Sequence, residues 1–152
     1  MLLDHDEDIQ MLADKLEQIH ENGLPSYPLI VFFYSGDGNP SNCIEMARDP
    51  NPSTGQPFDK NLGDYVSNAL SINPAVHDGA ICFARATKLH NYTLKGWSYR
   101  ITAAYLINNP DKNRGSAYNS AVSMSVSEGV VCVCLFLEGE YEMFVNGERI
   151  QL

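Results

Sequence analysis

Basic residues are scarce in this chain. Of its 152 residues, 10 are lysine or arginine and 19 are aspartate or glutamate, which gives a formal net charge of −9 and a pI near 4.7. A surface this acidic repels polyanions, so we expect no nucleic-acid partner. A small nucleotide is still compatible with the charge, because a few backbone N–H groups can bind phosphate inside an acidic protein.

Long apolar runs are also missing. No run approaches the length that spans a bilayer, and the acidic start of the chain, Asp4 to Asp8, lacks the basic flank of a signal peptide. We therefore expect no membrane partner and a cytoplasmic location.

Metal-binding patterns are equally sparse. There is no C-x-x-C pair, and His5, His20 and His90 are too scattered to predict a metal site. Cys132 and Cys134 are two residues apart in a strand-like run and so share one face. A two-thiolate metal site and a pair of small buried residues both remain open, and the second is favoured.

The length and the apolar share of 44% suit one domain with one core. Apolar residues recur at helical spacing before Gly23, and residues 29–34 form a continuous apolar run typical of a strand buried on both faces. The other expected elements are a helix at 62–70, a strand at 81–84, two short strands around Lys95 and Gly96, a short helix capped by Ser116, a strand at 130–136 and its partner at 141–145, followed by a tight turn at Asn146 and Gly147. Helices and strands interleave, which predicts a single α/β domain over residues 1–152, with an N-terminal helix at 1–23, a core at 29–150 and a mixed central β-sheet flanked by helices.

Residues 35–57 are rich in turn formers and predict a long loop. Gly36-Asp37-Gly38 within it lacks the spacing and the lysine of a P-loop, so a surface turn or lid is the favoured interpretation. Residues 108–115 predict a second loop.

The strongest candidate binding element is Asp78-Gly79-Ala80, which follows His77 and opens into a strand. Gly79 would let a ligand approach the backbone, and the small side chain of Ala80 would leave space for it. Asp78 offers a carboxylate to a metal ion or a ribose. An ordinary turn is the competing interpretation, with His77 a hydrogen-bonded structural histidine.

Gly115-Ser116 is a candidate second wall. A Gly-Ser turn that opens a helix exposes unpaired N–H groups and the positive end of the helix dipole, which suits an anion. Ordinary helix capping is the alternative.

The order of these parts resembles the diadenylate cyclase (DAC) domain, the fold of the DisA N-terminal domain. Members carry a strand opening in Leu-His-Asp-Gly-Ala and a later Gly-Thr-Arg-His-Arg-Ala-Ala segment that starts a helix. The resemblance implies that Asp78 takes the metal-binding and ribose-activating role, and that Gly115 and Ser116 match the Gly-Thr pair. If the chain is active, it further implies a magnesium or manganese ion bound together with the nucleotide.

The family's Arg-His-Arg is replaced here by Ala117, Tyr118 and Asn119. Condensing two ATP molecules needs cations that stabilise the leaving pyrophosphate, and none of these three supplies one. Lys112 and Arg114 lie just upstream but outside the motif's register. We therefore expect a degenerate active site.

A site that has lost its catalytic residues can still bind a nucleotide. Tyr118 would stack on a base and Asn119 would read a base edge or ribose, while Tyr92, Trp97 and Tyr99 would either form a lid or fill the core or an oligomer interface.

Three functions stay open. The leading hypothesis is a non-catalytic, DAC-like sensor that binds a nucleotide or nucleotide-derived signal through Asp78, Gly79, Ala80, Gly115, Ser116, Tyr118 and Asn119, with no cofactor required. The alternatives are a divergent diadenylate cyclase that makes cyclic di-AMP from ATP, and a structural or assembly module with a vestigial pocket. A homo-oligomer or a fused or associated effector is a possible partner.

Overall fold

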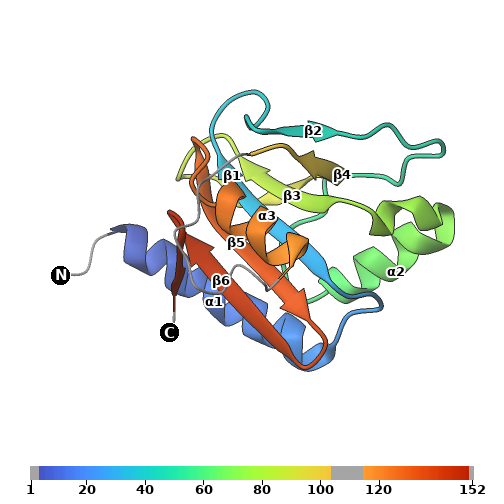
Figure 1. Ribbon diagram of the computed structural model, residues 1–152, viewed down its shortest axis with the longest axis horizontal. Helices are drawn as coiled ribbons and strands as arrows, with labels where there is room; N and C mark the ends of the chain where they lie inside the picture. Colours follow the sequence, from blue (N-terminus) through green and yellow to red (C-terminus); the bar gives the residue numbers. More distant parts are fainter. Residues whose placement is uncertain (1–3, 104–114, 151–152) are drawn as a thin grey trace.

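The computed structural model describes residues 4–103 and 115–150, and in that part of the chain it shows one α/β domain (Figure 1). In chain order, its elements are α1 (Asp4–Asn22), β1 (Leu29–Ser35), β2 (Cys43–Glu45), α2 (Leu62–Ile72), the 3₁₀ helix η1 (Pro74–His77), β3 (Ala80–Arg85), β4 (Thr93–Ile101), α3 (Ser116–Met124), β5 (Val130–Leu137), β6 (Glu140–Val145) and β7 (Glu148–Ile150). The predicted α/β class is confirmed.

The strands form one mixed sheet in the order β2-β4-β3-β1-β5-β6-β7. β1 and β3 run parallel, and the other paired neighbours are antiparallel. The two parallel strands therefore lie in the middle of the sheet and share a common amino end and a common carboxyl end.

Helices cover both faces of the sheet, with α1 and α2 on one side and α3 on the other (Figure 1). β1 is buried on both sides: Val31 and Phe33 belong to the core under α1 and α2, while Phe32 belongs to the core under α3. The prediction from its continuous apolar run is confirmed. α1 ends just before Gly23, as expected. The Gly23 N–H donates to the carbonyl of Ile19 at 3.0 Å, and Gly23 has a φ of 83°.

The strand predicted at 81–84 is confirmed as β3, and the residues before Asp78 form the 3₁₀ helix η1. Three expectations about local structure were wrong. β4 is one nine-residue strand where two short strands were predicted. The predicted loop at 35–57 contains the short strand β2, which pairs with the end of β4. Ser116 is the first residue of α3, and Gly115 occupies the N-cap position. Most of the predicted 108–115 loop lies outside the described residues.

The tight turn at Asn146 and Gly147 is confirmed, since both residues have positive φ values, 52° and 85°. It joins β6 to β7.

Cys82, Cys132 and Cys134 are small buried residues of the sheet. Cys132 and Cys134 both contact the core under α1 and α2, which confirms that they share a face, and no part of either is exposed. Burial raises the pKa of the Cys132 thiol to about 12 and raises that of Cys134 as well. Both thiols therefore stay protonated near neutral pH, as is usual for small buried cysteines.

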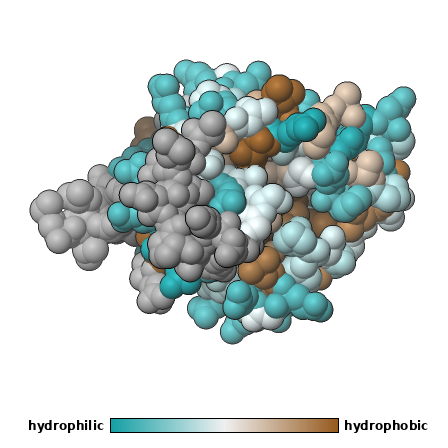
Figure 2. All heavy atoms as spheres, in the orientation of Figure 1, coloured by the Kyte–Doolittle hydropathy of each residue, from teal (hydrophilic) through white to brown (hydrophobic). Residues whose placement is uncertain are grey.

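Over the described ranges, 4–103 and 115–150, no helix has the length and apolar character needed to cross a membrane. The face shown in Figure 2 carries mostly hydrophilic side chains with small apolar groups between them. The large apolar side chains that are most exposed among the described residues are Met11, Ile44, Ile72 and Leu89.

Candidate functional site

An open cavity of about 660 Å³ lies at the amino ends of the parallel strands β1 and β3. The end of β4 and the first turn of α3 complete its wall. The cavity is lined by Ser26, Tyr27, Pro28, Ile30, Met46, His77, Asp78, Gly79, Ala80, Tyr99, Arg100, Ile101, Ser116, Ala117 and Ser120. Two stretches predicted from the sequence, Asp78-Gly79-Ala80 and the start of α3, therefore meet at one site although they are far apart in the chain.

Asp78 is presented by the short helix η1. Asn73 caps this helix, because its side-chain oxygen accepts a hydrogen bond from the Ala75 N–H at 3.1 Å. The same side chain donates to the carbonyl of Pro50 at 3.0 Å, and the Asp78 N–H closes the helix on the Ala75 carbonyl at 3.1 Å. The exposed Asp78 side chain thus projects from the end of a short helix whose start and end are both fixed by hydrogen bonds.

Gly79 has a second role that the sequence did not indicate. Its φ is 105°, and a Cβ there would lie 3.0 Å from Met46 Cε and 3.1 Å from the backbone of both Ser98 and Tyr99. The glycine therefore lets η1 approach β4 closely, in addition to lining the cavity. Ala80 begins β3 beside Tyr99 of β4, as a buried residue of the wall.

Arg48, which was not predicted from the sequence, links Asp78 to β4 by hydrogen bonds. Its Nε donates to the Ser98 hydroxyl at 3.2 Å, and its guanidinium also donates to the backbone carbonyl of Asp78 at 3.3 Å. Arg48 comes shortly after β2, in the segment that looked like an unstructured loop. Its role depends on a long-range strand pairing between β2 and β4, for which the local sequence carries no signal.

The start of α3 forms the facing part of the lining, with Ser116 and Ala117 from its first turn and Ser120 from the next. The N–H groups of a first helical turn have no partner within the helix, and the helix dipole adds partial positive charge there. Gly115 precedes the turn as N-cap with a φ of 104°, but it is not itself part of the lining. This turn offers hydrogen-bond donors suited to an anion.

Arg100, near the end of β4, is a second residue that sequence reasoning missed. Its exposed side chain lines the cavity and is the only lysine or arginine among the described lining residues. The pairing of β3 with β4 contains register irregularities, so simple alternation along β4 does not predict which side chains face the cavity.

Tyr118 and Asn119 are placed differently from the prediction. The Tyr118 side chain is 7% exposed and packs edge-on against Phe144, with ring centroids 5.4 Å apart, in the core under α3. Neither Tyr118 nor Asn119 is part of the cavity lining. At about 100° per residue, Ser116, Ala117 and Ser120 share the face of α3 that lines the cavity, whereas Tyr118 and Asn119 lie on other faces of the helix.

The proposed aromatic lid is not formed. Tyr92 and Trp97 belong to the core under α1 and α2, and the Trp97 indole donates to the Ser53 carbonyl at 2.9 Å. Tyr99 lines the cavity as a buried residue packed edge-on against Phe32. The alternative interpretation, that these aromatics fill the core, is confirmed. His77 lines the cavity with an exposed side chain, and its Nδ1 lies 2.8 Å from the Pro74 carbonyl oxygen.

The cavity has no donor set for a resident metal ion. In the portion of the chain that is described, no three histidine, cysteine, aspartate or glutamate side chains are grouped closely enough to hold a metal. Asp78 alone would supply one ligand to an ion that arrives with a nucleotide.

The chain matches no protein-family model and no curated protein sequence. Membership of the diadenylate cyclase family therefore stays a prediction from the order of elements and the residues quoted above.

Proposed function

We propose that the chain is a non-catalytic sensor domain that binds a nucleotide or a nucleotide-derived signal in the cavity beside Asp78. The observation that carries the proposal is that Asp78-Gly79-Ala80 and the first turn of α3 line the same cavity. The volume of about 660 Å³ lies within the range of small-molecule sites, roughly 300–1,000 Å³.

The chemistry of the lining suits the parts of a nucleotide. The N–H groups of α3 and the Arg100 guanidinium are donors for a phosphate, and the Asp78 carboxylate is an acceptor for ribose hydroxyls. Apolar contact for a base is available from Tyr27, Ile30 and Tyr99. These assignments replace Tyr118 and Asn119 with residues that reach the cavity.

Binding without catalysis is supported by the residues at the start of α3. Ala117 lines the cavity where the diadenylate cyclase pattern has an arginine, and Tyr118 is buried where that pattern has a histidine. Loss of one donor that stabilises transition-state charge costs about 3 kcal/mol, a factor of about 100 in rate. The α3 N–H groups and Arg100 can therefore hold a phosphate, while Ala117 and Tyr118 supply no cation at the positions where the diadenylate cyclase pattern has them for cleavage of a triphosphate.

Calorimetric titration of the full chain with ATP, AMP, GMP, cyclic di-AMP and cyclic di-GMP tests the proposal. At least one of these compounds is expected to bind saturably, and Asp78→Ala and Arg100→Gln are expected to weaken that compound by about tenfold each. Asp37→Ala is the matched control, because Asp37 is an exposed acid outside the cavity. If none of the compounds binds, or if Asp78→Ala binds as tightly as the Asp37→Ala control, the sensor function is wrong.

Incubation with ATP and Mn²⁺, followed by chromatography, separates the sensor from a divergent cyclase. The sensor function predicts an unchanged ATP peak. Conversion of ATP to cyclic di-AMP would show that the chain is an enzyme instead.

A further inference from the structure

Two opposite charges line the cavity described above, the carboxylate of Asp78 and the guanidinium of Arg100, and both side chains are exposed. Their backbones are neighbours, because a Cβ at Gly79 would lie only 3.1 Å from the backbone of both Ser98 and Tyr99. Asp78 precedes this close contact on one segment, and Arg100 follows it on the other. A ligand in the cavity therefore meets a positive and a negative charge on the same wall.

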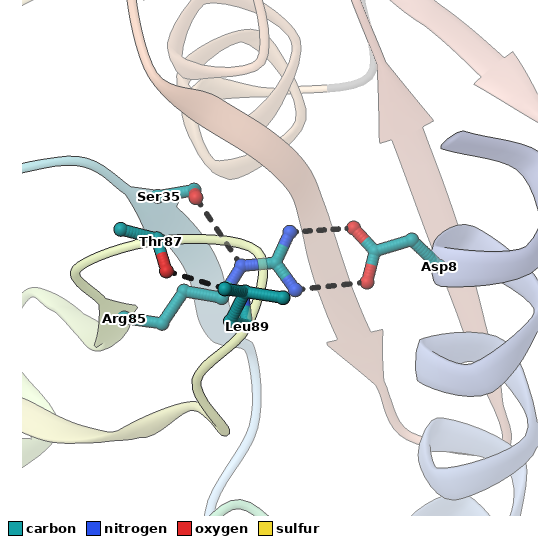
Figure 3. Close-up of polar contacts among 5 residues, drawn as sticks. All are labelled: Asp8, Ser35, Arg85, Thr87 and Leu89. Carbon is teal, nitrogen blue, oxygen red and sulfur yellow. Dashed lines mark hydrogen bonds and ion pairs between the residues drawn. The ribbon is translucent and has the colours of Figure 1, made fainter. Parts of the chain in front are cut away.

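The Arg100 guanidinium is not used within the protein. In the residues that the structure describes, its side chain makes no hydrogen bond and no ion pair. By contrast, Arg85 donates to both carboxylate oxygens of Asp8, at 3.0 and 2.7 Å (Figure 3), and Arg48 donates to the Ser98 hydroxyl at 3.2 Å. Arg100 is therefore free to bind one anionic group of a ligand.

The Asp78 backbone is fixed, whereas its carboxylate has no partner in the described ranges. The Asp78 N–H donates to the Ala75 carbonyl at 3.1 Å, and the Asp78 carbonyl accepts from Arg48 at 3.3 Å. Arg48 thus contacts the backbone of Asp78, and it is not part of the cavity lining. The carboxylate can accept from a hydroxyl group of a ligand, and it repels any anionic group that comes close.

The other described lining residues add no formal charge when histidine is counted as neutral. Among them, His77 has its Nδ1 2.8 Å from the Pro74 carbonyl oxygen. One cation therefore faces a ligand in the described lining, within a chain whose formal net charge is −9. A first phosphoryl group would bind Arg100. Each further one would find no second cation in this lining and would be repelled by Asp78 and by the acidic chain.

We propose that the cavity selects a nucleoside monophosphate over the corresponding di- and triphosphates, and that Asp78 determines this selection. The inference rests on the proposed function, because it names the class of nucleotide for the same site. Arg100 binds the single phosphoryl group, and Asp78 accepts from the ribose hydroxyls. The charge of the same carboxylate disfavours the additional phosphates.

Calorimetric titration of the full chain at low ionic strength, with AMP, ADP and ATP and with GMP, GDP and GTP, tests the selection. EDTA is present, because divalent cations would bind and neutralise the additional phosphates. At least one monophosphate is expected to bind about fivefold more tightly than the triphosphate of the same base. If the triphosphate binds as tightly, or if only a cyclic dinucleotide binds, the selection is wrong while the sensor function stands. If no nucleotide of either kind binds, the sensor function itself is wrong.

Variants assign the selection to Asp78. Asp78→Asn removes the charge and keeps a side chain of the same size with an oxygen acceptor. It is expected to lower the ratio of the triphosphate Kd to the monophosphate Kd from about five to less than about two. A merely structural loss would weaken both ligands equally and leave this ratio near five, and that result would overturn the assignment to Asp78.

Two further variants serve as controls. Arg100→Gln is expected to weaken both ligands by a similar factor and to leave the ratio unchanged, because each ligand places one phosphoryl group at this guanidinium. Asp37→Asn, at an exposed acid outside the lining, is expected to leave both affinities and their ratio unchanged. If Asp37→Asn lowers the ratio as much as Asp78→Asn does, the selection comes from the overall charge of the chain, and the role of Asp78 is wrong.

Discussion

Asp8 and Arg85 are single residues whose opposite charges are buried together, with side-chain exposures of 9% and 5% (Figure 3). Removing one partner leaves the other charge desolvated without compensation. We expect Asp8→Ala to lower the free energy of unfolding by about 3 kcal/mol, as measured by urea denaturation at pH 7.

Asp14→Ala is the matched control on the same helix, because Asp14 is exposed and its hydrogen bond to Gln10 joins two surface side chains. It is expected to change stability by less than about 0.5 kcal/mol. Equal stability of the two variants would show that the Asp8–Arg85 pair contributes nothing beyond a surface contact.

Gly79 and Gly115 have nearly the same φ, 105° and 104°, but different surroundings. Among the described residues, a Cβ at Gly115 meets nothing within 4 Å, whereas at Gly79 it meets Met46 and the backbone of β4. We expect Gly115→Ala to cost about 1.5 kcal/mol from backbone strain alone and Gly79→Ala to cost about 3 kcal/mol. Thermal and urea unfolding of both variants measure the difference, and a larger loss at Gly115 would contradict it.

Among the elements, the short helix η1 determines where Asp78 lies. Its Asn73 cap satisfies the Ala75 N–H and reaches across to the Pro50 carbonyl. We expect Asn73→Ala to lower the free energy of unfolding by about 1 kcal/mol and to weaken the compound that binds beside Asp78. Asn68→Ala, at an exposed position of α2, serves as the control. If Asn73→Ala loses stability but retains full affinity, η1 does not position the site.

The elements that could be predicted are those whose pattern is local. α1 and α2 follow from helical spacing and β1 and β5 from continuous apolar runs, because each buries a face that its own sequence defines. β2 is only three residues long and is stabilised by pairing with β4. That pairing is a property of the folded sheet, so the sequence of residues 35–57 gave no sign of it.

The candidate site divides in the same way. Asp78, Gly79, Ala80 and Ser116 were recognised from turn chemistry next to a strand or a helix, and all four line the cavity. Arg100 and Arg48 were not recognised. The position of Arg100 depends on the irregular pairing of β4 with β3, and that of Arg48 depends on how closely the segment after β2 approaches Ser98 and Asp78. Tyr118 was misplaced because its direction depends on which face of α3 meets the sheet.

On the scale of the whole molecule, the two faces of the sheet bury weakly acidic groups that are neutral at pH 7. Burial raises the pKa values of Cys82, Cys132 and Cys134 above their ordinary value of 9.0, and those of Tyr92 and Tyr99 above 10.0. In the unfolded chain these groups ionise at their ordinary values. Above pH 9 the unfolded state therefore releases protons that the folded state retains, and stability falls as the pH rises.

Each buried thiol contributes a loss of up to about 1.4 kcal/mol per pH unit between its unfolded and folded pKa values. We expect the free energy of unfolding, measured with urea under reducing conditions, to be nearly constant from pH 7 to 8 and to fall steeply between pH 9 and about 10.5. Cys134→Ala removes one of these groups, so its stability is expected to fall less steeply in the same interval, although the variant starts lower at pH 7 because a buried side chain has been shortened. The slope isolates the effect of proton release from that of packing, since only the former depends on pH. A wild-type chain that is as stable at pH 10.5 as at pH 8 would show that the thiols ionise as easily in the folded sheet as in the unfolded chain.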